Sequence, residues 1–262
     1  MELWRAVLIA IANGLAEILP ISAFGHFEIL KELMVDHSDA FKMIIRFSCV
    51  GVMLAIVTFY RKDIARLFAK KSRSELFWIL LMGLPSLVLF CLLEGKFPPF
   101  FYRLSVVAAA LLIMSLIMLN FDKLTKLAQK KAKKRAELKA STALLAGLLG
   151  SISILPGFSR IAILMMMGHL YNEKRDIVIR HAILANIPVL IAMVIKCLCY
   201  GGIDFVTTNF APVALGIVVG FLTSLGALVM LQNINKKHDP LRVFGWYQLV
   251  LALVVLVFEL IK

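Results

Sequence analysis

The sequence predicts an all-α polytopic membrane protein with six transmembrane helices and two re-entrant helical hairpins. Hydrophobic residues make up 61% of the 262 positions, and the mean hydropathy is +0.90, both typical of a membrane protein rather than a soluble domain. Charged residues concentrate between long apolar runs, and polar motifs interrupt two of these runs. Because a nucleic-acid-binding protein gathers basic residues on one soluble face, the formal charge of +13 does not indicate that class.

Eight apolar stretches define the predicted elements. Crossing a hydrocarbon core of about 30 Å takes about 20 helical residues. Six runs approach this length: 43–60, 76–93, 103–121, 182–200, 211–231 and 243–261. Two further stretches, 6–33 and 142–170, contain Gly and Pro near the middle. Because these residues break helices, each stretch is predicted to form two short helices joined by a turn.

The distribution of Lys and Arg orients these elements. Three connecting segments are rich in basic residues, which places them in the cytoplasm. They are 61–75, 122–141 and 232–242. By contrast, 201–212 has no Lys or Arg, and the only basic residue of 94–102 is Lys96. Six spans fit this assignment only if the 6–33 hairpin enters and leaves from the outside and the 142–170 hairpin from the inside.

The resulting topology is an inverted repeat, in which each half has one re-entrant hairpin followed by three spans. The first repeat is 1–121 and the inverted second repeat is 142–262, joined by a basic cytoplasmic linker at 122–141 within one membrane domain, 1–262. Gly14 and 19–20 (Leu-Pro) recur as Gly150 and 155–156 (Leu-Pro) at one constant offset. Inverted repeats of this kind place a binding site near the bilayer midplane, between the halves.

Two motifs place polar groups inside apolar flanks. The first covers 13–26 and includes Glu17 and His26, and the second covers 150–160 and ends with Arg160. Polar backbone at membrane depth occurs where protein buries it or where it lines a watery cavity. Ionisable residues there are candidate functional groups. The two motifs are therefore the predicted site.

Arg160 is the candidate phosphate-binding group, because its planar guanidinium binds two oxygens and stays charged. The turn that contains Gly157 would offer backbone N–H groups to the same anion. Alternatively, Arg160 extends to the membrane interface or pairs with a structural carboxylate. Ser22 and Ser159 are candidate hydroxyl ligands or nucleophiles. Alternatively, they bond to backbone or pack at helix contacts, as serines in membrane helices commonly do.

Glu17 and His26 are the other candidate reactive groups. Glu17 is a candidate ligand for a divalent cation, since Mg²⁺ commonly takes one or two carboxylates together with substrate phosphates. Alternatively, Glu17 is simply the partner of Arg160, with no metal. His26 is a candidate general acid–base, because its ordinary pKa lies close to working pH. Alternatively, it is a hydrogen-bonded structural residue.

The two motifs resemble those of the undecaprenyl-pyrophosphate phosphatases of bacterial membranes. The matching residues are Gly14, Leu15, Glu17, Leu19, Pro20, Ser22, Gly25 and His26 in the first motif and 156–160 in the second. Length, span count and inverted hairpins extend the resemblance over nearly the whole chain. It implies hydrolysis of a polyprenyl (undecaprenyl) pyrophosphate to the monophosphate, at the outer face of the bacterial plasma (inner) membrane. This activity recycles the lipid carrier for peptidoglycan synthesis and can confer bacitracin resistance.

The resemblance also implies roles for individual residues. The catalytic positions would be Glu17, His26 and Arg160. The substrate-binding positions would be Ser22, Gly157, Ser159 and Arg160. A divalent metal, Mg²⁺ or Ca²⁺, would be held at Glu17 and Asn13. The expected partners are a polyprenyl pyrophosphate or phosphate lipid and membrane lipids, with no nucleic acid. A homodimer is left open.

Several residues depart from the family pattern. Asn13 stands where the family has its first glutamate. Ala23 stands at the second serine position of the motif, and that serine looks like the family's proposed nucleophile. Phe24 replaces a threonine, 161–164 replaces a polar segment, and Gly150 replaces a glutamine. Two hypotheses remain. The protein is either a divergent phosphatase, or a catalytically weak or inactive paralogue that binds or translocates polyprenyl phosphate across the membrane.

Overall fold

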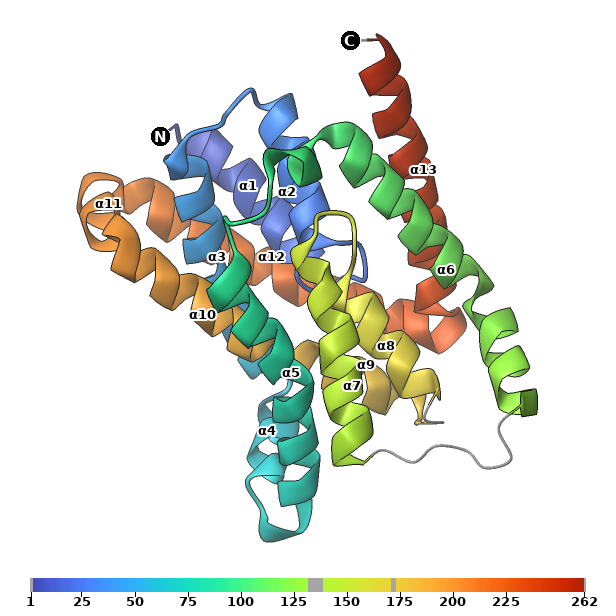
Figure 1. The fold of residues 1–262 in the computed structure, drawn as a ribbon. Coiled ribbons are helices and arrows are strands. Elements are labelled where there is room, and N and C mark those ends of the chain that lie inside the picture. The colour runs from blue at the N-terminus through green and yellow to red at the C-terminus, as the bar shows by residue number, and fades with distance from the viewer. Residues whose placement is uncertain (1, 132–138, 171–172, 262) are drawn as a thin grey trace.

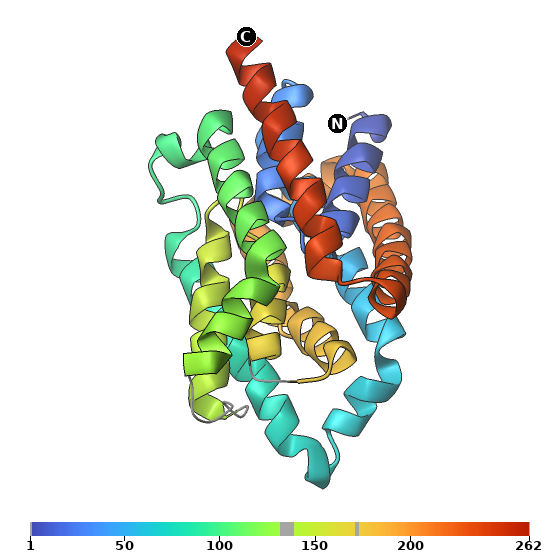
Figure 2. The same ribbon diagram turned by 90° about the vertical axis from the view of Figure 1, so that its right-hand side faces the viewer.

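The structure is a computed structural model that describes residues 2–131, 139–170 and 173–261. Within these ranges the backbone forms helices and turns and no strand (Figures 1 and 2). Six segments are long and apolar enough to cross a membrane: Asp39–Phe59, Arg73–Leu93, Leu104–Lys123, Arg175–Thr208, Phe210–Lys237 and Pro240–Ile261. The predicted all-α polytopic class and its six spans are therefore confirmed.

Both interrupted stretches fold as helix–turn–helix hairpins. Their helices are α1 (Leu3–Ala16), α2 (Ala23–Leu33), α7 (Ala140–Gly150) and α8 (Arg160–Leu170), and the short 3₁₀ helix η3 (Ser151–Ile154) follows α7. The longest, α1, has 14 residues and so extends about 21 Å, less than the roughly 30 Å core. The two turns meet inside the molecule (Figure 1). This arrangement is consistent with the predicted re-entrant hairpins.

The two halves of the chain are packed into each other. The six spans contain α3 (Asp39–Phe59), α5 (Arg73–Leu93), α6 (Leu104–Lys131), α10 (Ile187–Cys197), α12 (Phe210–Lys237) and α13 (Pro240–Ile261). The hairpin helix α1 packs on α12 of the other half, and its counterpart α7 packs on α5. In the same way α3 contacts α12, α10 contacts α5, and α6 pairs with α13. This exchange of partners is consistent with an inverted repeat.

An arginine from each half of the chain forms an ion pair at one end of α5. Glu75, near the start of α5, accepts a hydrogen bond from Arg180 at 2.9 Å. Glu94, just past its end, accepts one from Arg46 at 3.0 Å. Arg46 lies on α3 and Arg180 on α9 (Arg175–Leu184), and each of these is the first helix after the hairpin of its half. The two arginines therefore have corresponding positions in the two halves.

The fourth span is not the single helix predicted over 182–200. It is divided into α9 and α10, followed by a π-helical turn η4 (Leu198–Gly202) and α11 (Ile203–Thr208). The first break falls at Ala185 and Asn186. Pro188 explains it, because proline has no N–H for the carbonyl of Leu184 and its ring crowds that position. The break places Asn186 in the protein interior.

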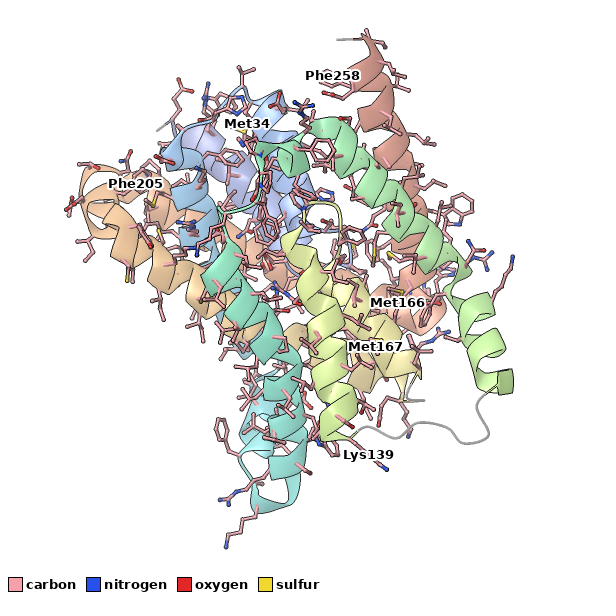
Figure 3. The ribbon with its side chains drawn as sticks, viewed as in Figure 1. Met34, Lys139, Met166, Met167, Phe205 and Phe258 are labelled. Atoms are coloured by element: carbon pink, nitrogen blue, oxygen red, sulfur yellow. The ribbon has the colours of Figure 1, made fainter. Side chains whose placement is uncertain are left out.

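The basic segments contain more helix than their predicted role as connections requires. The 61–75 segment includes α4 (Arg61–Leu67) and a 3₁₀ turn η1 (Lys70–Ser72). In the predicted 122–141 linker, α6 continues to Lys131, while 132–138 lies outside the described residues. A further 3₁₀ turn, η2 (Pro99–Tyr102), precedes α6. In Figure 1, α4 lies at the bottom of the molecule and both chain termini at the top. Figure 3, drawn from the same side, shows Lys139 of the predicted linker at the lower end of α7.

Candidate active site

The turns of the two hairpins are joined through Ser22. Its Oγ accepts hydrogen bonds from the backbone N–H of Gly157, at 3.1 Å, and of Gly25, at 3.3 Å. Ser22 has φ of 67°, a left-handed conformation that is uncommon for a residue with a side chain. A conformation of this kind costs about 1–3 kcal/mol and persists where surrounding contacts enforce it. The Ser22 contacts fix the first motif against the second.

Glu17 and Arg160 meet beside these turns. Glu17 is the C-terminal cap of α1, and Arg160 is the first residue of α8. Arg160 Nη2 lies 3.5 Å from Glu17 Oε2, and the two side chains are only 9% and 2% exposed. Ser159 begins α8 by accepting a hydrogen bond on its Oγ from the backbone N–H of Ala162, at 3.3 Å. The predicted meeting of these two charges at the hairpin turns is thus present.

Asn186 is a site residue that the sequence reasoning missed. Its Nδ2 donates to Glu17 Oε2 at 3.0 Å and to the Glu17 carbonyl oxygen at 3.1 Å, and the residue is fully buried. These bonds orient the carboxylate from the other half of the chain. The sequence did contain a signal, because Asn186 is a polar residue inside an apolar run, two positions before Pro188. The same criterion, a polar group inside apolar flanks, identified both motifs.

Several polar atoms at the site have no hydrogen-bond partner among the described residues: Glu17 Oε1, Arg160 Nε and Asn13 Oδ1. Glu17 and Arg160 also line a cavity of about 20 Å³, together with Ala23, Phe24 and Ser159. This volume accommodates about one water molecule. Because buried polar atoms are normally paired, the unpaired atoms of the two lining residues Glu17 and Arg160 fit a site that takes water or another polar ligand.

The donor set fits a divalent cation only together with ligand oxygens. Asn13 lies one helical turn before Glu17, so their side chains share a face of α1. Its Nδ2 donates to Ser48 Oγ at 2.6 Å, and its Oδ1 has no hydrogen-bond partner among the residues that the structure describes. Within the part of the chain that the structure describes, no group of three or more His, Cys, Asp or Glu is arranged so that it could hold a metal ion by itself. Two protein oxygens completed by phosphate oxygens match the way Mg²⁺ is commonly bound.

His26 is not part of this cavity lining. Its Nδ1 lies 2.9 Å from the Ser22 carbonyl oxygen, and its Nε2 lies 2.8 Å from Tyr247 Oη on α13, with the two rings stacked. A carbonyl only accepts, so neutral His26 carries its proton on Nδ1 and accepts from the Tyr247 hydroxyl. The ring therefore links the first turn to α13, and its acid–base role stays a prediction. Gln248 adds a second link by donating to the Pro20 carbonyl oxygen at 3.0 Å.

A larger cavity of about 740 Å³, which we call the vestibule, adjoins the small one. Phe24 lines both cavities. The charged residues of the vestibule are Lys31, Lys42, Arg46, Lys96 and Lys196 against Glu28, Asp39 and Glu94, so its lining is net positive. A net positive approach attracts an anionic ligand toward Arg160.

The comparison with known proteins identifies the family. A family model described as "Bacitracin resistance protein BacA" matches residues 6–254. The chain belongs to the BacA family. Undecaprenyl-diphosphatase 1 of Clostridioides difficile is 28% identical over 98% of this chain and 96% of the relative. Undecaprenyl-diphosphatases of Desulfitobacterium hafniense and Enterococcus faecalis are 27% and 26% identical, with the same two coverages. The resemblance carried by the two motifs is confirmed at the level of the family.

Three residues that the sequence analysis expects to depart from the family motif lie at or near the cavity. Ala23 and Phe24 line it in place of the expected serine and threonine. Asn13 is fully buried in place of the expected glutamate. At these positions, residues without a charge or a nucleophile therefore surround the Glu17–Arg160 pair.

Proposed function

We propose that this BacA-family protein hydrolyses a polyprenyl diphosphate, releasing the terminal phosphate and leaving the lipid monophosphate. The observation that carries this proposal is the buried Arg160, which faces Glu17 at the junction of the two motif turns. Arginine matches a diphosphate in charge and geometry, and the net positive vestibule leads toward it. The relatives named undecaprenyl-diphosphatase support an undecaprenyl lipid as the substrate.

The orientation of the vestibule supports a reaction at the outer face. Arg46, Glu94 and Lys196 of the vestibule gather at the end of α5 remote from the basic 61–75 segment. Since basic segments remain in the cytoplasm, the vestibule opens to the outside of the bacterial plasma (inner) membrane. The product there is the monophosphate carrier that cell-wall synthesis reuses.

The residues at the site suggest direct attack by water. Arg160 binds the diphosphate oxygens, and the entering anion replaces Glu17 as its partner. Asn186 keeps Glu17 Oε2 in place, so Oε1 accepts a proton from the water that the small cavity accommodates. The water oxygen bonds to the terminal phosphorus as the bond to the bridging oxygen breaks. The leaving electron pair stays on the lipid monophosphate, where Arg160 stabilises the charge.

A divalent metal is part of the proposal. Asn13 and Glu17 would hold Mg²⁺ or Ca²⁺ together with phosphate oxygens. When bound, such an ion neutralises charge on the diphosphate. We expect EDTA to abolish phosphate release and to weaken binding of the lipid diphosphate, measured separately by equilibrium binding.

The test is a phosphate-release assay. Purified protein in detergent is mixed with undecaprenyl diphosphate or farnesyl diphosphate and Mg²⁺ or Ca²⁺, and free phosphate is measured. Release above the Arg160→Ala background supports hydrolysis. Binding without release, together with movement of polyprenyl phosphate across proteoliposome membranes, would reject the enzyme and favour translocation.

Restoring the two family residues is expected to raise activity. Ala23→Ser combined with Asn13→Glu adds a hydroxyl at the cavity and a carboxylate one turn before Glu17. A correctly positioned catalytic group contributes about 10²-fold or more, so phosphate release should rise by about that factor. Ala16→Ser, which adds a hydroxyl to another wall of the cavity, is the control. An unchanged rate in the double variant would mean that the cavity no longer has the family geometry.

Removing the amide of Asn186 is expected to misplace Glu17. Asn186→Leu keeps the branched shape of the side chain but removes both hydrogen bonds to Glu17, so kcat should fall by about 10–100-fold, the typical cost of losing an orienting partner. Asn120→Leu is the control, because Asn120 is exposed on α6 and its amide donates to the Leu116 carbonyl oxygen of the same helix. Full activity in Asn186→Leu would show that Glu17 needs no support from the fourth span.

A further inference from the structure

An apolar groove of about 800 Å³ runs beside α5 and α10, and we call it the α5–α10 groove. Its size falls in the range of pockets that bind small organic ligands. On α5 the lining extends from Leu76 to Cys91, which is fifteen steps from residue to residue and so about 22 Å along the helix axis. Leu80 and Ile191 in this lining are about half exposed, so the groove faces the bilayer. It therefore follows most of the depth of a hydrocarbon core of about 30 Å.

The groove is continuous with the vestibule. Cys91, Lys196 and Tyr200 line both. At its other end the vestibule shares Phe24 with the cavity of Glu17 and Arg160. Shared wall residues thus link the cavity of Arg160, the vestibule and the groove, and α4 contributes to the walls at the inner end of the groove.

The lining changes from net positive in the vestibule to apolar in the groove. The vestibule is net positive, whereas the groove is lined by apolar side chains with Lys196 as its charged lining residue. Lys196 lies at the junction, where its Nζ pairs with Glu94 Oε2 at 2.8 Å and lies over the Phe90 ring. A ligand that matches this sequence of surfaces has an anionic head and a single long apolar chain.

We propose that the α5–α10 groove binds the polyprenyl chain of the lipid whose diphosphate binds at Arg160. This rests on the proposed function and names the part of the protein that recognises the substrate's length. The chain enters the groove from lipid rather than from water, so the hydrophobic effect contributes little. The groove acts instead by holding the chain in one direction, which keeps the diphosphate positioned at Arg160. A chain of few isoprene units leaves the inner part of the groove unfilled.

A bulky residue in the groove tests this proposal. Leu80→Trp fills part of the inner half of the groove, and Leu222→Trp is the matched control, since Leu222 is 60% exposed on α12 and is absent from the groove lining. We expect Leu80→Trp to lower kcat/KM for undecaprenyl diphosphate by about tenfold, within the range for one altered pocket group, and to leave farnesyl diphosphate unchanged. Equal loss for both substrates, or no loss, would overturn the proposal.

A binding measurement separates this proposal from the proposed function. Leu80→Cys, in a background with Cys91→Ser and Cys199→Ser, places one accessible thiol in the groove, because Cys49 and Cys197 are buried. We expect undecaprenyl phosphate, but not a two-chain phosphatidate, to slow its alkylation by N-ethylmaleimide several-fold. Leu222→Cys should react at an unchanged rate. Equal protection by phosphatidate would make the groove a general lipid contact, even if hydrolysis is observed. Selective protection without hydrolysis would retain the groove and reject the enzyme.

Discussion

Arg160→Ala is expected to lower phosphate release from undecaprenyl diphosphate by about 10³-fold or more. An arginine that stabilises charge on a transferring phosphoryl group is worth roughly 10³–10⁵ in kcat. Arg160 is the guanidinium in the lining of the small cavity, and it is almost completely buried, so little water screens its interaction with the substrate. The measurement is steady-state phosphate release at saturating lipid.

Folding must be separated from chemistry in this experiment. Arg160→Ala leaves Glu17 as a buried charge without its cation, which commonly costs about 3–5 kcal/mol. Arg160→Lys keeps the charge but loses the planar fork, and should fold normally with an intermediate rate. Arg61→Ala, at an exposed arginine on α4, should behave as wild type. Wild-type release from folded Arg160→Ala would contradict the assigned role.

Gly157→Ala is expected to disrupt the junction of the two hairpins. Gly157 has φ of +106°, which residues with a side chain rarely adopt. An added Cβ would collide with the Ala110 side chain and lie 2.9 Å from the Val107 carbonyl oxygen on α6. Backbone strain and overpacking each cost about 1–3 kcal/mol. We expect a clear fall in thermal midpoint in detergent, and loss of phosphate release as the Gly157–Ser22 hydrogen bond is broken.

Substitutions at two other glycines separate the cost of backbone strain from the cost of steric collision. Gly95→Ala carries the strain of a positive φ, +78°, with nothing within 4 Å of the added Cβ. Gly226→Ala lies within α12 with neither strain nor close neighbours. We expect Gly95→Ala to lower the midpoint by a few degrees and Gly226→Ala to leave it unchanged or higher. A midpoint for Gly157→Ala equal to that of Gly95→Ala would show that α6 yields to the added methyl group.

Much of the fold followed from local properties of the sequence. Apolar length identified all six spans, and the Gly and Pro residues in 6–33 and 142–170 identified both hairpins. The prediction of a single helix for the fourth span was wrong, because the chain divides into two helices at Asn186 and Pro188. That break was readable in principle, since proline within a helical run removes a backbone hydrogen bond.

The site was predicted only in part. Glu17 and Arg160 stood out as ionisable residues inside apolar flanks, and the structure brings them together. Asn186, Tyr247 and Gln248 were missed, although they hold Glu17, His26 and the first turn. Each lies in an apolar run long enough to be taken as an ordinary span, so its polar group attracted no attention.

The sequence by itself determined the class of the protein, because the length and apolarity of a segment decide whether it can cross a bilayer without reference to other segments. It also determined the chemical character of the motifs. Only the tertiary structure decided which groups meet: Glu17 pairs with Arg160 across 143 positions and with Asn186 across 169. Such pairs depend on how the two halves pack together, and a local pattern carries no information about that packing.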